Sequence, residues 1–303
     1  MPNSLLYLLS TLIWGSTWLA ITFQFGDVPA TASVAYRFLL AGGVMLGWCI
    51  VRGVSTRVSR QQLGWIALQG VLMFGVSYML VYEAERHIPS GLVAVLNSSM
   101  VIFNLIGARL VFGRTIDAKS GIGAVMGIVG IALVFWPELT SVRGSASLPG
   151  LGLGLCAAIL ASCGNLVAQR NREANLPLLP TIGYGMVTGG LVALLFTLLR
   201  DGRLVFDLRP SYLGSLAYLA FLGSIIAFAS YLTLLGRIGA ARAGYVAVAV
   251  PIVALVLSAQ FEHFEWHALT FVGIASAAIG NVVMLADIQA LLGRIGIGRF
   301  ARA

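Results

Sequence analysis

Polar and aromatic side chains recur at helical spacing within long apolar stretches of this chain. At 100° per residue they form stripes on single helix faces, and a path for a polar solute through a membrane needs such inward-facing groups. Indole and phenol rings would accept an apolar group, while the amides of Asn97 and Asn165 could bind an amine or a carboxylate. The candidate substrate contacts are Trp14, Thr17, Trp18, Arg37, Tyr78, Tyr82, Asn97, Asn165, Gln169, Ser224, Tyr231 and Pro251.

Each candidate also has a purely structural interpretation. Serine, asparagine and glutamine in membrane helices often do no more than hydrogen-bond to a neighbouring helix. Tyrosine and tryptophan near helix ends can belong to the interfacial aromatic belt, an alternative that applies more to Tyr82 than to Trp14 or Tyr78. The set as a whole is therefore more informative than any one member.

Arg37 is the one charged residue with apolar sequence on both sides. A guanidinium inside a membrane helix costs several kcal/mol unless it is paired or reaches the surface, on the order of what is seen for other buried charges. The long stem of arginine permits such a reach toward the headgroups. The alternative is that Arg37 binds a substrate carboxylate or a partner acid through two parallel hydrogen bonds.

The sequence contains no arrangement that would predict catalysis, a cofactor or a metal site. No serine, cysteine or histidine within the apolar stretches has a partner for nucleophilic chemistry. His263, Glu265 and His267 alternate at an expected turn, where an interfacial loop is the better interpretation. The glycine-rich segments lack a preceding strand, and Cys49, Cys156 and Cys163 are interpreted as packing residues.

The acidic residues all fall at expected helix ends, in loops or in the tail, so we expect no carboxylate at mid-membrane depth. Proton-coupled carriers commonly use such a group as a relay. The hypothesis is therefore facilitated diffusion or exchange. Glu83 and Glu85 are the relay candidates if transport proves to be proton-coupled.

Composition indicates the elements that must position these residues. The chain has 303 residues, of which 59% are hydrophobic and only 10% charged, and its mean hydropathy is +0.93. Because a spanning helix needs about 20 apolar residues, we expect an all-α integral membrane protein with hardly any soluble part. The first span lacks the features of a cleaved signal peptide. The expected spans are 4–24, 31–51, 63–82, 89–111, 119–137, 148–169, 177–199, 212–235, 242–260 and 267–287.

The net charge of +8 comes from dispersed basic residues, which argues against a nucleic-acid partner and for a role in orientation. With both termini in the cytoplasm, the inner loops and tail would carry Arg52, Arg57, Arg60, Arg109, Arg114, Lys119, Arg170, Arg172, Arg237, Arg242, Arg294, Arg299 and Arg302. The outer loops would carry only Arg86, Arg143, Arg200, Arg203 and Arg209. This bias predicts a multi-pass protein of a bacterial inner membrane with cytoplasmic termini.

An internal duplication underlies the ten spans. Shifting the chain by 148 positions pairs Pro29 with Pro177, Tyr36 with Tyr184, Gly42 with Gly190 and Val44 with Val192. At the nearly identical offset of 150, the stripe Gly123, Gly127 and Gly130 matches Gly273, Ala277 and Gly280, and small residues at this spacing predict close helix packing. Five spans per copy would invert the second copy. We expect repeats at 1–137 and 148–287, a connector at 138–147, and a basic tail at 288–303.

Several motifs resemble the EamA-type family of the drug/metabolite transporter superfamily. They are the run from Trp14 to Trp18, the prolines Pro29 and Pro177 before spans 2 and 7, and the G-x-V-A-V starts of spans 4 and 9. Within that family, the chain looks most like bacterial exporters of aromatic and other neutral amino acids. The resemblance implies that spans 1–4 and 6–9 surround a central cavity while spans 5 and 10 stand aside. Members often carry proline in span 4, where this chain has Ser98, so a kink is expected only at Pro251 in span 9.

The combined expectation is a carrier with two inverted five-helix repeats around a central cavity, which exports small amphipathic metabolites by alternating access. Aromatic and other neutral amino acids are the expected substrates, membrane lipids the surroundings, and a monomer the expected state. Two alternatives stay open. One is an exporter of drugs or lipid-linked metabolites, and the other is a scaffold or sensor that transports nothing.

Overall fold

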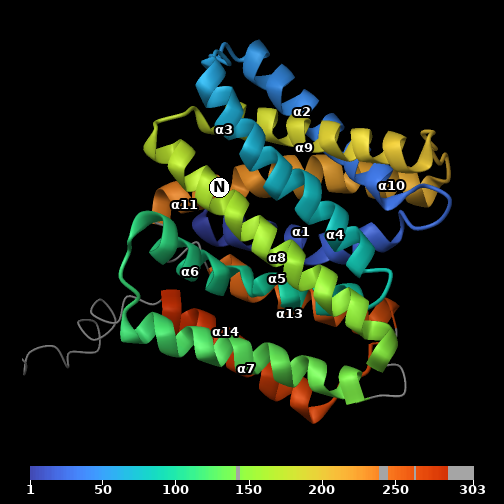
Figure 1. The fold of residues 1–303 in the computed structure, drawn as a ribbon, viewed down its shortest axis with the longest axis vertical. Helices are drawn as coiled ribbons and strands as arrows, with labels where there is room; N and C mark the ends of the chain where they lie inside the picture. Colours follow the sequence, from blue (N-terminus) through green and yellow to red (C-terminus); the bar gives the residue numbers. More distant parts are fainter. Residues whose placement is uncertain (141–143, 239–244, 263, 286–303) are drawn as a thin grey trace, which may run out of the picture.

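The computed structural model describes residues 1–140, 144–238, 245–262 and 264–285, and every regular element in these ranges is a helix (Figure 1). The first half contains α1 (Asn3–Thr22), α2 (Ala30–Val51), α3 (Arg60–Gly70), η1 (Val71–Val76), α4 (Ser77–Ala84), α5 (Ser90–Ser98), α6 (Met100–Phe112) and α7 (Ala118–Thr140). The second contains α8 (Gly144–Glu173), α9 (Leu178–Asp201), α10 (Pro210–Ala217), η2 (Tyr218–Ile226), α11 (Ala227–Ile238), α13 (Tyr245–Phe261) and α14 (Ala268–Leu285).

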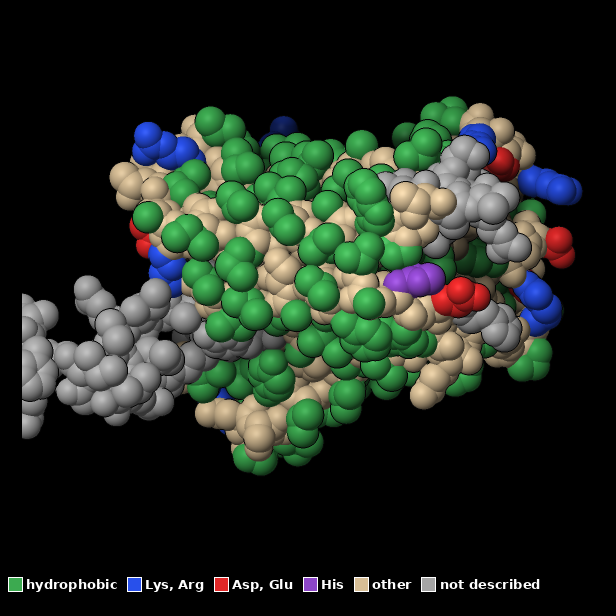
Figure 2. All heavy atoms as spheres, turned by 90° about the horizontal axis from the view of Figure 1, so that it is seen from below, with side chains coloured by type: hydrophobic (Ala, Val, Ile, Leu, Met, Phe, Trp, Pro, Cys, Tyr) green, Lys and Arg blue, Asp and Glu red, His purple; other side chains and the backbone are tan. Residues whose placement is uncertain are grey.

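Eight helical stretches of the described residues are long and apolar enough to cross a membrane. Two further apolar helices, Val246–Phe261 and Ala268–Val283, are shorter and correspond to the ninth and tenth expected spans. Figure 2 shows hydrophobic side chains over the middle of one flank and charged side chains toward its two ends. The expected basic tail at 288–303, together with Arg242 and His263, lies outside the described residues.

Local sequence signals account for several helix ends. Pro29, Pro89 and Pro177 stand directly before α2, α5 and α9, where their missing N–H group costs no hydrogen bond. Gly113 and Gly202 end α6 and α9 in the left-handed conformation, with φ of 65° and 67°. The helices α7 and α8 run to Thr140 and from Gly144, into the segment 138–147 that was expected to be a connector.

Two helix pairs pack closely on opposite sides of the bundle (Figure 1). In the α7–α14 pair, a Cβ atom built on Gly130 would lie 2.6 Å from the Gly273 carbonyl oxygen, and one on Gly273 would lie 2.6 Å from the Gly130 oxygen. In the α2–α9 pair, a Cβ on Gly42 would lie 2.8 Å from the Gly183 oxygen. The packing role predicted for the small-residue stripe is confirmed.

The remaining helices surround the centre of the bundle. Helix α1 packs on α11, η2 and α13, helix α8 packs on α3, η1 and α4, and α5 packs on α13. Hydrogen bonds then define the two ends of the bundle. At one end, which we call the Glu85 end, Arg209 donates to the Phe25 carbonyl. At the other, which we call the Arg52 end, Arg237 donates to the Met1 carbonyl.

The glycine contacts generate a stability prediction. Gly273→Val should lower the thermal stability of the detergent-purified protein, because a side chain forced against the Gly130 backbone costs about 1–3 kcal/mol or more. Gly121→Val in α7 is the matched control, since a Cβ atom there meets nothing within 4 Å. Thermal melts followed by size-exclusion chromatography measure both variants. Equal melting temperatures would contradict the packing assignment.

Candidate functional site

A cavity of about 280 Å³ lies at the centre of the bundle, near the lower end of the range of small-molecule sites, which is about 300–1,000 Å³. Its walls come from α1, η1, α4, α5, α6, α8, α11 and α13. The lining residues are Trp14, Thr17, Trp18, Met73, Phe74, Ser77, Tyr78, Val81, Ala94, Asn97, Ser98, Met100, Val101, Ala161, Asn165, Phe228, Tyr231, Ala247, Val250 and Pro251.

The cavity brings together most of the residues singled out from the sequence. Those that line it are Trp14, Thr17, Trp18, Tyr78, Asn97, Asn165, Tyr231 and Pro251. They come from six of the expected spans, three in each half of the chain. Their contact with a substrate stays a prediction, but their convergence on one space follows from the fold.

Four candidates do not line the cavity. Arg37 and Ser224 bond to each other, with the Arg37 Nε donating to the Ser224 hydroxyl at 3.3 Å. Tyr82 donates to the Gln24 side-chain oxygen at 3.1 Å. Gln169 lies further along α8 toward the Arg52 end and donates to Glu173 at 3.0 Å. Gln169 thus lies one helical turn after the cavity residue Asn165 on α8, but beyond the cavity itself.

One wall of the cavity is aromatic. The Trp14 ring meets Phe228 edge-on at 5.1 Å between centroids and Tyr231 at 5.2 Å, and Phe74 meets Phe228 at 6.2 Å. The Trp14 indole N–H donates to the Gly223 carbonyl at 3.1 Å, which fixes the ring. Because these rings line the cavity, they give one of its walls an aromatic surface that can receive an apolar group.

The polar groups of the cavity are amides rather than charges. The Asn165 amide donates at 3.2 Å to the sulfur of Met100, which is a weak acceptor. The Asn97 side chain has no hydrogen-bond partner among the described residues. Both amides can therefore bond to a ligand with little competition from the protein.

Two π-helical segments stand beside the cavity and were not predicted. η1 supplies Met73 and Phe74 to the lining, and η2 supplies the Gly223 carbonyl that holds Trp14. π-helical segments are rare in proteins overall, but those that occur are often found at functional sites. Gly75 in η1 and Gly223 in η2 are also related by the offset of 148, and that match was the available signal.

Span 4 is interrupted, which corrects the expectation that only span 9 would be kinked. α5 ends at Ser98 and α6 begins at Met100. The hydroxyls of Ser98 and Ser99 each donate at 2.6 Å to a carbonyl three residues back, a geometry that bends helices. Serine thus interrupts the helix without proline, while Pro251 lies within α13.

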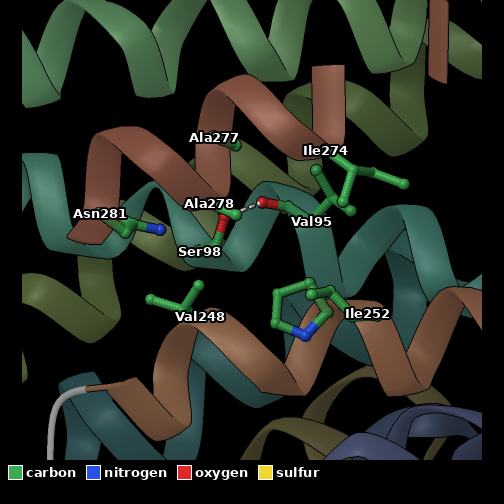
Figure 3. A pocket seen from close by; sticks show the side chains of 9 residues that line it. Val95, Ser98, Val248, Ile252, Ile274, Ala277, Ala278 and Asn281 are labelled. Atoms are coloured by element: carbon green, nitrogen blue, oxygen red, sulfur yellow. Dashed lines mark hydrogen bonds between the residues drawn. The ribbon is translucent and has the colours of Figure 1, made fainter. Parts of the chain in front are cut away.

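A notch of about 20 Å³ opens beside the main cavity between α5, α13 and α14 (Figure 3). It shares Ser98 and Pro251 with the cavity, and the Asn281 side chain of α14 points into it. A space of this size holds about one water molecule. It is too small for a lipid tail.

A group of buried polar residues lies at the Glu85 end of the bundle. Gln24, Arg37, Tyr82 and Glu85 are exposed by only 1%, 2%, 0% and 6%. The Arg37 guanidinium lies over the rings of Phe38 and Tyr78, 5.0 and 4.8 Å from their centroids. Arg37 is therefore buried in protein, and the interpretation that it reaches the headgroups is wrong.

Other residues noted in the sequence lie away from this centre. Glu265 and His267 are exposed, and the described residues contain no cluster of three metal-ligating side chains. Cys49 is buried as expected, whereas Cys156 is exposed, so the packing role assigned to it is wrong. Gly244, which begins the G-x-V-A-V motif of span 9, lies outside the described residues.

Comparisons with known proteins place the chain in a family. The sequence profile of the EamA-like transporter family matches it twice, at residues 1–136 and 148–286. A protein of Escherichia coli (strain K12) named "Uncharacterized inner membrane transporter YedA" is 31% identical, over 85% of this chain and 84% of that protein. Another from the same strain, named "Probable amino-acid metabolite efflux pump", is 22% identical, over 89% and 90%.

A solved structure described as "Crystal structure of protein" has the same fold. It superposes with a TM-score of 0.67 at 17% identity and covers 93% of this chain and 96% of its own. The profile matches and the relative named as an inner membrane transporter agree with the helices that are long and apolar enough to cross a membrane. The chain belongs to the EamA-like transporter family.

Proposed function

We propose that this protein exports small amphipathic metabolites, with aromatic and other neutral amino acids as the main substrate class, by alternating access. The observation that carries the proposal is the central cavity, which combines an aromatic wall with two weakly bonded amides. An apolar side chain fits the wall, and the amides suit the polar groups of an amino acid. The relative named as a probable amino-acid metabolite efflux pump supports the same class.

The proposed architecture is ten spans in two inverted repeats, at 1–137 and 148–287, joined by 138–147. The two profile matches support it, as do the π segments at corresponding positions. So does a pair of corresponding hydrogen bonds. The Tyr36 hydroxyl donates to the Val205 carbonyl at 2.9 Å, and the matching Tyr184 hydroxyl donates to the Thr56 carbonyl at 3.2 Å. Each tyrosine thus bonds to a loop of the other copy.

The conformation is proposed to be one with the Glu85 end closed. α5 and α13 touch near this end, where a Cβ atom built on Gly91 would lie 2.9 Å from the Leu255 Cα atom. Glu262 also accepts hydrogen bonds from the Ser90 N–H and hydroxyl. Toward the other end, α6 departs from the break at Ser99 and packs on α8. With the orientation expected from the basic residues, the closed end faces outward and the chain lies in the bacterial inner membrane as a monomer.

A lipid-linked substrate or drug is the alternative within transport. It would need a wide lateral opening, and the notch of about 20 Å³ at α14 does not provide one. The scaffold alternative gives no reason for a cavity lined by eight helical segments. A site for a water-soluble metabolite accounts better for a cavity that combines an aromatic wall with two weakly bonded amides.

Counterflow in proteoliposomes tests the substrate class. Wild-type protein should exchange labelled phenylalanine, and Trp14→Ala should lower kcat/KM roughly tenfold, equivalent to about 1.4 kcal/mol, through loss of the aromatic wall. Trp136→Ala is the matched control because that ring is 57% exposed on α7. No exchange by the wild type would favour a scaffold, and equal activity of the two variants would remove the cavity from the pathway.

Accessibility labelling tests the inversion. In a background without Cys49, Cys156 and Cys163, Ser55→Cys and Arg203→Cys place single thiols in the loops that receive the two tyrosine hydrogen bonds. Impermeant maleimide should label the position-203 thiol from outside and the position-55 thiol only after the membrane is opened. Labelling of both from one side would reject the inverted repeat.

The coupling mechanism is tested separately. No acidic side chain is among the residues that line the cavity, so we propose facilitated diffusion or exchange. Uptake into proteoliposomes should therefore equilibrate without accumulation, and dissipating a pH gradient should leave its plateau unchanged. Accumulation that collapses with the gradient would refute this mechanism and direct attention to Glu83 and Glu85.

A further inference from the structure

The polar cluster formed by Gln24, Arg37, Tyr82 and Glu85 lies immediately beyond the cavity, toward the Glu85 end. Tyr78 connects the two, because it lines the cavity and carries the Arg37 guanidinium over its ring at 4.8 Å. Tyr78 and Tyr82 lie one turn apart on α4, and Glu85, the residue directly after the helix, continues the same side. These residues therefore extend from the cavity wall toward the Glu85 end.

The donors of the cluster are only partly used. Arg37 donates from Nε to Ser224, but its Nη1 atom is buried and has no partner among the described residues. The Gln24 side-chain nitrogen is also buried and without a partner, while its oxygen accepts from Tyr82. Buried donors left unpaired are costly, and a carboxylate is the acceptor that a guanidinium binds best.

The acceptor of the cluster is unused as well. Both carboxyl oxygens of Glu85 are buried without a hydrogen bond, and Glu85 forms no ion pair within 4.0 Å in the described part of the chain. Arg37 acts on it electrostatically without touching it, and the nearby Glu262 is held by Ser90. The cluster therefore holds an unpaired positive group and an unpaired acidic group close together.

Such a pair fits one kind of solute well. A zwitterion placed between the two groups would satisfy Arg37 with its carboxylate and Glu85 with its ammonium. Burial raises the pKa of Glu85 well above its usual range, Glu262 adds to the rise, and Arg37 opposes it. An ammonium group beside Glu85 favours the charged carboxylate, so ligand binding would remove the penalty that the closed state imposes.

Building on the transport function proposed above, we propose that this polar cluster is a second substrate subsite, reached when the Glu85 end opens. Arg37 and Gln24 bind the carboxylate of a zwitterionic amino acid there, and Glu85 binds its ammonium group. The aromatic cavity would then select the side chain, and the polar cluster would select the zwitterion. In the closed conformation, a solute in the cavity touches none of Arg37, Gln24 and Glu85.

Three probes that share a phenyl ring separate this role from simple helix contact. Phenylalanine is a zwitterion, 3-phenylpropionate lacks the ammonium group, and phenethylamine lacks the carboxylate. Glu85→Gln should lower kcat/KM for phenylalanine and phenethylamine about tenfold and leave 3-phenylpropionate unchanged, because only the first two carry an ammonium group. Arg37→Lys keeps the charge but loses the planar fork, so it should lower the values for phenylalanine and 3-phenylpropionate and spare phenethylamine.

The neighbouring charged pair provides matched controls. Glu83 and Arg86 are about one-third exposed, at 37% and 38%, and lie 3.9 Å apart. Glu83→Gln and Arg86→Lys should leave all three probes unchanged. Equal loss of all three probes in Glu85→Gln, or no loss of any, would overturn the subsite and leave the aromatic cavity in place. If wild-type protein carries none of the probes, the proposed function itself fails.

Discussion

The hydrocarbon around the bundle contains no water, so each polar group within it needs a partner from the protein or a wet cavity. Most polar side chains of the helices satisfy this requirement locally or across one helix contact. The Ser10 hydroxyl donates to a carbonyl one turn back at 2.9 Å, and Thr197 donates to Thr31 across the α2–α9 pair at 2.7 Å. Among the described residues, the buried side-chain atoms left without a hydrogen bond include single groups spread over several helices, whereas the charged ones, those of Arg37 and Glu85, both belong to the polar cluster beyond the cavity. We propose function at the polar groups of the cavity and the polar cluster that lack a full set of partners, because these groups can still bond to a solute.

Close packing then separates a fixed frame from the helices that surround the site. The α2–α9 and α7–α14 pairs meet through glycine backbones, and neither pair supplies a residue to the main cavity. Helices whose backbones pack this closely have no low-energy position to slide into, since packed interiors have few voids. The cavity helices are different. Breaks and π segments at Ser99, η1 and η2 interrupt their regular hydrogen bonding. A change between open states is easier to place in these helices than in the glycine pairs.

The sequence was sufficient for features that depend on composition and periodicity. Long apolar runs predicted the helices to within a few residues, and stripes at helical spacing selected residues such as Trp14 and Asn165 that meet in the cavity. Features that depend on contacts between distant segments could not be predicted in this way. Glu85 was placed correctly at a helix end, but its burial depends on neighbours such as Arg37 and Glu262 that are remote in sequence. The break at Ser99 was missed because serine bends a helix only when its hydroxyl bonds back to the chain.

The two copies also differ at the position that Arg37 occupies in the first copy. At the offset of 148, Arg37 corresponds to Gly185, so a charged side chain in one copy is matched by a residue without a side chain in the other. A Cβ atom built on Gly70 would lie 2.2 Å from the Gly185 carbonyl oxygen, so the second copy has a backbone contact between two helices at this position and no charged side chain. The first copy closes over a guanidinium and a carboxyl group, whose desolvation costs free energy. Under the alternating access proposed above, the two open states would therefore differ in energy when the cavity is empty. A zwitterion that pairs with Arg37 and Glu85 would act on one end only, and a ligand shifts an equilibrium only through such a difference between states.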